Sequence, residues 1–233
     1  MTTKFKLAIA FAASLGAVAP LAGQAKKPAT TTGSADAGWV QLFDGKDLKG
    51  WRGYKKPDSS ETRWKVENGM LTIASNGAGD TKGQRDLITD ATYEQFDLRW
   101  EWKISQGGNS GVKYFVLEDE NSAIGHEYQV IDDERHADAK IGPHRQTAAL
   151  YDVFPAHDRP LKPAGEWNTS QVIVKGKHVT HILNGKTVLE YNEPAGVQAG
   201  RDFSRKIGEG TFALQAHDPK SVVRYKNIRV KRL

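Results

Sequence analysis

The sequence predicts an all-β fold, an antiparallel sandwich of two sheets packed face to face. Residues 96–104 alternate strictly, with apolar side chains at even positions and charged ones at odd positions, as a half-buried strand requires. Further short apolar segments follow at regular spacing, separated by Gly and Asn, which is typical of antiparallel sandwiches. No segment has the apolar spacing of a long helix, so a helical or mixed fold is not expected.

The remaining strands follow from similar short patterns, and the turns from residues that accept positive φ. Asn184-Gly185 is the clearest hairpin signal because both residues suit a type I′ turn. Turns are also expected at 67–69 and 175–177, and 206–209 would form one helical turn at most. The expected strands are 64–66, 70–74, 87–89, 96–104, 112–117, 128–131, 171–174, 179–183, 187–191, 212–216 and 222–230.

The N-terminal residues predict export. Lys4 and Lys6 precede an uncharged apolar run at 7–21, and small residues before and at Ala25 suit a signal peptidase. An uncleaved anchor is the alternative, although the run is short for a membrane span. The expected organisation is a signal peptide at 1–25, a flexible linker at 26–37 and one β-sandwich domain at 38–233.

Composition narrows the classes of protein further. The chain has no cysteine, so we expect neither disulfides nor a lipoprotein anchor, and the mature domain depends on its core for stability. Its net charge is +5, but lysines of the leader and linker supply most of it. Because basic and acidic residues are interleaved elsewhere, nucleic-acid binding is discounted. We expect a periplasmic or secreted protein without a membrane anchor.

Strand parity sorts the polar residues that could form a site. In 96–104 the tryptophans point inward, so Glu101 points outward. Lys113 is likewise opposite in parity to Val112, Tyr114 and Val116. By the same reasoning, we expect six polar residues to share one outer surface: Glu101, Lys113, Glu127, Gln129, Gln215 and His217. The alternative for each residue is an ordinary solvated strand face.

Two connecting segments add polar chemistry. The tight loop at 107–111 carries Asn109, which could hold a ligand or cap the turn. The segment at 132–151 is unusually rich in titratable groups, and a charged surface loop is its alternative interpretation. Among its polar residues, the site candidates are Asp132, Asp133, His136, His144, Arg145 and Tyr151. His126, Glu127 and His217 could contribute to a metal site, although their spacing matches no compact metal motif.

The order of the motifs resembles one known family, the 3-keto-disaccharide hydrolases, from about residue 39 to the end. The motifs are WVQLFDGKDLKGW at 39–51, WKVENG at 64–69, the strand at 96–102, GNSG at 108–111, EYQVID at 127–132, ALYD at 149–152, GEWN at 165–168, HILNG at 181–185 and LQAH at 214–217. The resemblance implies a concanavalin A-like jelly roll that acts on glycosides already oxidised to a ketone at C3.

The resemblance also implies a reaction. A C3 ketone acidifies the C2 proton, so a base can remove it, the C1 substituent can leave by β-elimination, and water can then add. The implied catalytic residues are Glu101, Glu127, His144 and His217, with His144 or His217 as base. The implied substrate-binding residues are Asn109, Lys113, Gln129, Asp132, Tyr151 and Gln215. One divalent metal, held by Glu127 and His217, would serve as electrophile; no organic cofactor is expected, and a separate sugar 3-dehydrogenase would supply the substrate.

Two other functions stay open. A direct glucanase-type glycosidase needs two carboxylates flanking the scissile bond, but Glu101 is followed by Trp102, Lys103 and Ile104 rather than by the acidic motif of glucanases of this fold. A non-catalytic sugar-binding module would stack exposed aromatic rings on sugars, for which Trp51 and Trp167 are the candidates.

Overall fold

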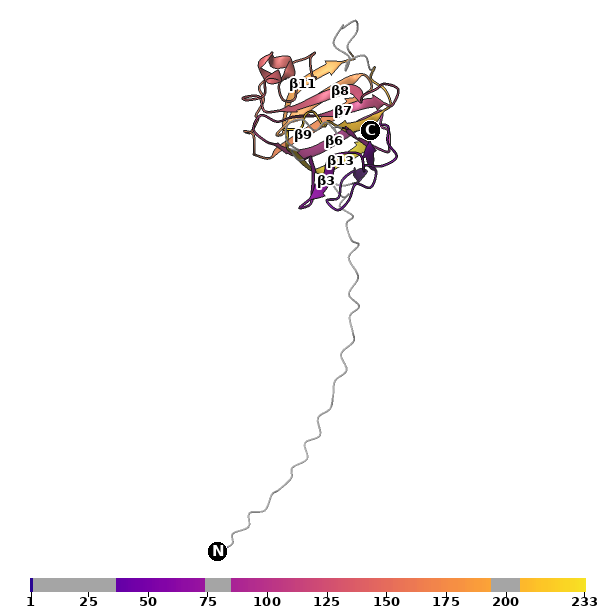
Figure 1. The fold of residues 1–233 in the computed structure, drawn as a ribbon, viewed down its shortest axis with the longest axis vertical. Coiled ribbons are helices and arrows are strands. Elements are labelled where there is room, and N and C mark those ends of the chain that lie inside the picture. The colour runs from indigo at the N-terminus through magenta and orange to yellow at the C-terminus, as the bar shows by residue number, and fades with distance from the viewer. Residues whose placement is uncertain (2–36, 74–84, 194–205) are drawn as a thin grey trace, which may run out of the picture. The chain divides into compact units, whose positions relative to one another are not determined.

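The computed structural model describes residue 1 and residues 37–73, 85–193 and 206–233. The chain divides into residues 1–37 and a compact unit of residues 38–233, which holds two antiparallel sheets (Figure 1). The predicted signal peptide and almost all of the predicted linker lie outside the described residues and stay predictions. In the described part of the chain, no helix is long and apolar enough to cross a membrane.

The larger sheet has eight strands and the smaller sheet five. In spatial order the larger sheet contains β11 (Lys186–Asn192), β10 (His178–Leu183), β9 (Asn168–Lys175), β6 (Phe96–Ile104), β13 (Val223–Arg232), β4 (Met70–Ile73) and β3 (Trp64–Glu67), with β1 (Trp39–Gln41) also paired to β13. The smaller sheet contains β2 (Trp51–Gly53), β5 (Leu87–Thr89), β12 (Thr211–Leu214), β7 (Asn109–Leu117) and β8 (Ile124–Ile131). Two short 3₁₀ helices, Asp138–Lys140 and Pro143–Arg145, follow β8.

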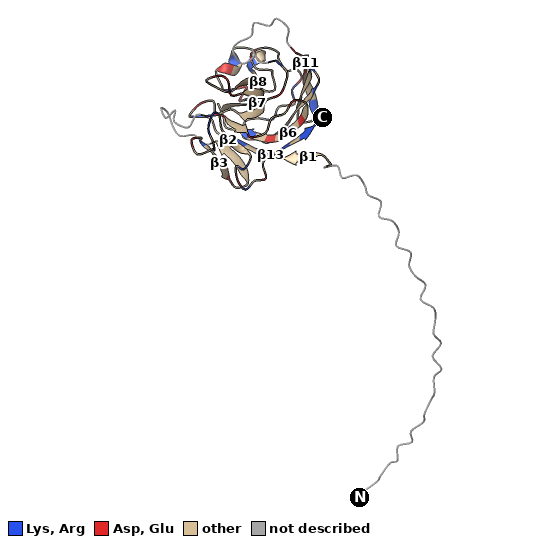
Figure 2. Cartoon of the chain, turned by 90° about the vertical axis from the view of Figure 1, so that its right-hand side faces the viewer, with Lys and Arg blue, Asp and Glu red and all other residues tan. Residues whose placement is uncertain are grey.

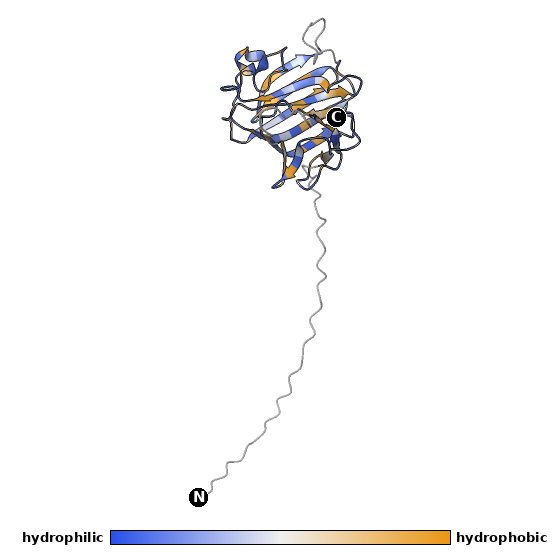
Figure 3. Ribbon diagram, in the orientation of Figure 1, coloured by the Kyte–Doolittle hydropathy of each residue, from blue (hydrophilic) through white to orange (hydrophobic). Residues whose placement is uncertain are grey.

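The core fills the space between the sheets. Apolar and polar segments alternate along the strands (Figure 3), and the inward side chains form one cluster. Trp100 and Trp102 of β6 are 2% and 1% exposed, and the Trp100 ring meets Tyr128 of the opposite sheet edge to face at 5.0 Å. Aromatic pairs of this kind stabilise beyond the apolar area they bury, so the alternation in β6 ties the two sheets together.

The predicted all-β sandwich is confirmed, and most predicted strands occur within a few residues of their expected bounds. β1 and β2 escaped prediction because three residues are too few to show an alternation. Ala74, the expected end of one strand, lies outside the described residues.

One parity prediction is wrong. Phe115 has a φ of 62°, and the pairing of β7 with β8 shifts register between Tyr114 and Leu117. Such a bulge inserts one residue and reverses the facing of those that follow. Val116 therefore leaves the inner face and packs in a separate cluster with Tyr54 and Ile88.

Candidate active site

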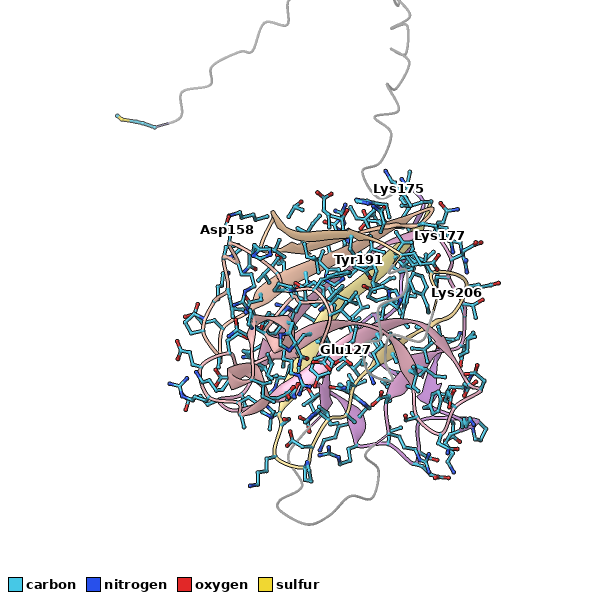
Figure 4. The ribbon with its side chains drawn as sticks, turned by 90° about the horizontal axis from the view of Figure 1, so that it is seen from above. Glu127, Asp158, Lys175, Lys177, Tyr191 and Lys206 are labelled. Atoms are coloured by element: carbon cyan, nitrogen blue, oxygen red, sulfur yellow. The ribbon has the colours of Figure 1, made fainter. Side chains whose placement is uncertain are left out.

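A buried pair of opposite charges lies on the outer face of the smaller sheet. Lys113 of β7 stands directly opposite Glu127 of β8, with Nζ 3.8 Å from Glu127 Oε2. The two residues are only 6% and 1% exposed, and buried charges of this kind need partners. Glu127 lies far from Lys175 and Lys177, which mark one end of the larger sheet (Figure 4).

The lysine is fixed by two further groups. Its Nζ donates to the carbonyl of Ala123 at 2.9 Å and lies 3.3 Å from Asp86 Oδ2. Asp86 Oδ1 in turn accepts from the backbone N–H of Ala216 at 3.0 Å. Sequence reasoning missed Asp86, because an acidic residue just before a three-residue strand gives no parity signal.

Glycine 111 makes room for the glutamate. A Cβ at Gly111 would lie 2.0 Å from Glu127 Oε1, 2.6 Å from Cδ and 2.8 Å from Cγ, closer than any real Cβ contact. The glutamate side chain therefore lies across the β7 backbone. Residue 111 must lack a side chain for this carboxylate to keep its place.

Two amide side chains on the sheet face that carries the carboxylate are incompletely bonded. Gln215 Nε2 donates to Glu127 Oε2 at 3.3 Å, while Gln215 Oε1 is buried without a partner among the described residues. Asn109 is 1% exposed, and in the same described residues neither Oδ1 nor Nδ2 of its side chain has a hydrogen-bond partner. Buried amides are nearly always bonded, so these unused groups favour a ligand that completes them.

A loop runs beside β8 and brings a phenol close to the site. Ala148 N–H donates to Gln129 O at 2.9 Å and Tyr151 N–H donates to Glu127 O at 3.0 Å. Burial raises the pKa of the Tyr151 hydroxyl, and the carboxylates of Asp138 and Glu127 raise it further. Tyr151 is therefore a neutral proton donor at ordinary pH.

A pair of histidines follows the ends of β8 and β12. The rings of His136 and His217 are 5.6 Å apart, and His217 Nδ1 lies 3.0 Å from Asp218 Oδ2. Burial opposes ionisation of Asp218, but hydrogen bonds from Ser221 and His217 outweigh it and lower its pKa to about 2. Ser221 Oγ also accepts the backbone N–H of Asn109 at 2.7 Å, which couples the histidine cluster to the start of β7.

The donor set of this cluster suits a divalent cation. His136, His217 and Asp218 each offer one ligand atom, and these atoms lie within 4.8 Å of one another. Two imidazoles and a carboxylate are common ligands of catalytic metals. His136 Nδ1 accepts the backbone N–H of Asp138 at 3.1 Å, so ligation through its Nε2 requires the ring proton to move. Among the described residues the cluster includes His217 as predicted, but it does not include Glu127.

The structure separates Glu101 from the other predicted catalytic residues, and that prediction of one common surface is wrong. Glu101 belongs to β6 of the larger sheet, whereas Lys113 and Glu127 belong to the smaller sheet. Its carboxylate accepts from Asn227 Nδ2 at 2.6 Å and lies 3.2 Å from Lys226 Nζ. Parity tells which face of its own sheet a side chain occupies, but not to which sheet the strand belongs.

Other predicted residues have mainly structural contacts. Asp132 is 4% exposed, and its two oxygens accept the backbone N–H groups of Gly107 and Glu134 at 2.7 and 3.0 Å. His144 Nε2 lies 3.3 Å from Asp152 Oδ1. Gln129 is 1% exposed on the same face as Glu127, and its Oε1 accepts Val130 N–H at 3.0 Å.

A hydrogen-bonded chain of rings lies between the two sheets, joining side chains on the inner side of β7 and β8 to side chains of β10 and β11. His181 Nδ1 is 2.8 Å from the carbonyl of Ala148; since a carbonyl only accepts, Nδ1 carries the proton. His181 Nε2 then accepts from Tyr114 OH at 2.8 Å. It follows that Tyr114 accepts from Tyr191 OH at 2.7 Å, and Tyr191 accepts from His126 Nδ1 at 2.9 Å. This chain of rings ends at Ala148, on the loop that carries Tyr151. Sequence analysis did not predict this chain; it named His126 only as a possible metal ligand.

Fold and site together define a class. The molecule is a two-sheet sandwich whose smaller sheet carries ammonium, carboxylate, amide and imidazole groups, the groups that orient small polar ligands. The chain belongs to the family described as the 3-keto-alpha-glucoside-1,2-lyase-like domain, which it matches over residues 38–231. The family resemblance seen in the motifs is confirmed.

Individual relatives agree with this assignment. The 3-keto-disaccharide hydrolase of Bacteroides thetaiotaomicron is 39% identical over 171 residues, which cover 66% of this chain and 59% of that protein. A solved structure from Parabacteroides distasonis, provisionally described as a glycosyl hydrolase, is 29% identical with a TM-score of 0.73 and covers 84% of this chain and 94% of that one.

A more distant structure bears on the fold alone. SCLam, a non-specific endo-beta-1,3(4)-glucanase, is 13% identical with a TM-score of 0.50, and the match covers 83% of this chain and 91% of that one. The concanavalin A-like jelly roll that the motifs implied is confirmed.

Proposed function

We propose that this domain cleaves 3-keto-glycosides by C2 deprotonation, β-elimination and hydration. Membership of the family and the name of the Bacteroides relative support this substrate class. The observation that carries the proposal is the buried Lys113–Glu127 pair. On the same sheet face, Gln215 Oε1 and both polar side-chain atoms of Asn109 lack partners among the described residues. Such an arrangement supplies a base, a positive charge and unused hydrogen-bonding groups at one place.

In the proposed reaction, each proton transfer and the stabilisation of charge are assigned to a particular residue. Glu127 removes the C2 proton, and the C–H electrons form an enolate on the C3 oxygen, whose charge the Lys113 ammonium stabilises. The enolate collapses to a C1–C2 double bond as the C1–O bond breaks, and the departing oxygen takes a proton from Tyr151. Water then adds its oxygen to C1, Glu127 returns a proton to C2, and the spare proton of the water restores the acid.

Glu127 replaces the histidines as the proposed base because the structure encloses it. Its carboxylate lies beside the ammonium of Lys113 and the amide of Gln215, whereas His144 is bound to Asp152 outside this cluster. Asn109 and Gln215 hold the sugar hydroxyls in this proposal. Gln129 and Asp132 position the strand end and the loop.

A bound cation would polarise the C3 ketone and the C2 hydroxyl. His136, His217 and Asp218 would hold it. Its identity is left open, and dialysis against a chelator followed by addition of single divalent metals tests the requirement. Full turnover by metal-free protein would remove the cation from the proposal.

The proposal is tested with a 3-keto aryl glucoside and its unoxidised parent. The wild-type protein should release the aryl alcohol only from the keto form, and in D₂O it should exchange deuterium into C2. Glu127→Gln should lower kcat/KM about 1,000-fold or more, the size typical of losing a proton-transfer group. Glu101→Gln, the same change on the other sheet, is the matched control and should stay within about twofold.

The alternatives give different results in the same assay. Cleavage of the unoxidised parent without C2 exchange would establish a direct glycosidase instead. Glu101 and Glu127 cannot flank one glycosidic bond as a direct glycosidase requires, because the two residues lie in different sheets. Binding of the keto sugar without release of the alcohol would establish a binding module.

Two wider proposals follow from the chemistry. Because the substrate is an oxidised sugar, a separate sugar 3-dehydrogenase must supply it. Residues 1–25 direct export to the periplasm or the medium in this proposal, and N-terminal sequencing of the mature protein tests for cleavage after Ala25.

A further inference from the structure

The outer face of the larger sheet is strongly basic where its two long central strands pair. The facing pairs along β6 and β13 are Lys103 with Arg224, Glu101 with Lys226, Arg99 with Arg229, and Asp97 with Lys231. Six of these eight side chains are cationic. Figure 2 shows the charged segments of β6 and β13 next to each other.

Two of the four pairs oppose like charges. Cations directly across from one another in a sheet destabilise it, and Arg99 with Arg229 and Lys103 with Arg224 both do so. The two acidic side chains neutralise only two of the six cations, since Asp97 is bound to Arg99 at 2.8 Å and Glu101 to Lys226 at 3.2 Å. A net positive charge therefore remains on the face, which favours an anionic partner.

Two tryptophans keep the cations in place. Arg99 and Arg229 lie 4.5 and 4.8 Å from the ring centre of Trp39. Lys226 and Lys103 lie 4.2 and 5.1 Å from that of Trp167. Cations over aromatic rings are attracted to them, so these side chains are held along the sheet rather than left to spread into solvent.

A cavity of about 430 Å³ opens on the same face. Its volume lies in the range that encloses small ligands. The lining is mostly polar and includes Arg99, Glu101, Gln171, Asn227 and Arg229. Asn227 has a φ of 51°, and it sits in the register shift of β13 that separates Lys226 from Arg229.

We propose that this face binds an acidic polysaccharide through its uronate groups, as a second site apart from the cluster at Glu127. Guanidinium groups bind carboxylates with two parallel hydrogen bonds, and several cations along one strand pair can bind several carboxylates of one glycan. The cavity is better suited to sugar rings than to the flat surface of a lipid bilayer. Bound glycan would keep the domain near polymeric material while its other sheet carries out the reaction.

The test uses tetragalacturonate as probe in calorimetry with the full mature chain. We expect binding that weakens as salt is added, because exposed charges are screened. Arg224→Gln with Arg229→Gln should weaken it at least tenfold. Folding should survive, since each change relieves a like-charge pair, and kcat/KM for a 3-keto glucoside should stay within about twofold.

The matched control removes the same charge elsewhere. Lys46 and Lys49 are exposed in the segment between β1 and β2, and Lys46→Gln with Lys49→Gln should leave the affinity unchanged. Three results would overturn the proposal: no binding of tetragalacturonate, equal loss in the control variant, or equally tight binding of dextran sulfate or phosphatidylglycerol vesicles. Because turnover is measured separately, failure here leaves the proposed reaction untouched.

Discussion

The two sides of the smaller sheet carry polar clusters built from neighbouring residues of the same strands. On the inner side, Tyr114 joins a chain of rings whose hydrogen bonds are 2.7 to 2.9 Å long. On the outer side, Lys113 and Glu127 are charged and lie 3.8 Å apart, and Gln215 Oε1 and the Asn109 amide on this side have no partner among the described residues. A satisfied network rigidifies a fold, whereas an incomplete one is ready for a ligand.

The largest effect should come from closing the space that the outer cluster needs. Gly111→Ala places a Cβ 2.0 Å from Glu127 Oε1, so the carboxylate must move, and kcat/KM should fall about 100-fold or more because misplacing a reacting group by about 1 Å costs that much. Gly208→Ala is the control, since nothing lies within 4 Å of its new Cβ. Unchanged turnover in Gly111→Ala would show that the observed position of Glu127 is not the working one.

The inner cluster should instead be seen in the pH dependence of stability. Burial lowers the pKa of His181 to about 4 from 6.5. Between these values the unfolded chain binds a proton that the folded chain does not, so stability is full above pH 6.5 and falls as the pH drops. The loss attributable to His181 should reach about 3 kcal/mol near pH 4.

This prediction is checked by urea unfolding at several pH values. The slope of unfolding free energy against pH should flatten in His181→Gln and should persist in His178→Gln, an exposed position of the same strand. An NMR titration of the His181 ring checks the cause directly. If the ring becomes charged near pH 6.5, the hydrogen-bond direction assigned to the inner chain is wrong.

The two clusters also show what sequence reasoning can reach. Alternation placed Lys113, Glu127, Gln129 and Gln215 on one outer face, and the pairing of β7, β8 and β12 in one sheet brings them together. It could not place Glu101, because every outward residue of either sheet gives the same pattern. The opposed Arg99–Arg229 pair was hidden for a similar reason, since strand pairing between residues 130 apart in the chain leaves no local signal.

Hydrogen-bond state was equally out of reach of the sequence. Tyr114 looked like a core position, and nothing in the sequence spacing shows that its hydroxyl bonds to both His181 and Tyr191. Gly111 looked like part of a turn, although its role is to leave room for a side chain of the neighbouring strand. Such features depend on distances that parity does not encode.

The smallest effect is expected from alanine substitutions of two asparagines that are each 1% exposed. Asn109 makes no side-chain hydrogen bond to described residues, whereas Asn168 accepts from Lys162 N–H at 3.0 Å and from Asn184 Nδ2 at 2.8 Å. Asn109→Ala should lower kcat/KM about tenfold, the worth of about one hydrogen bond to substrate, with less than about 1 kcal/mol lost in stability. Asn168→Ala should cost about 2 kcal/mol in stability and leave kcat/KM within about threefold.

Urea unfolding and steady-state kinetics of both variants make the comparison. The reverse pattern, with Asn109→Ala unstable and fully active, would mean that its amide is satisfied by water in the resting protein and does not meet the sugar. The unused amide would then lose its value as a marker of the site, and the buried Lys113–Glu127 pair would have to carry the assignment alone.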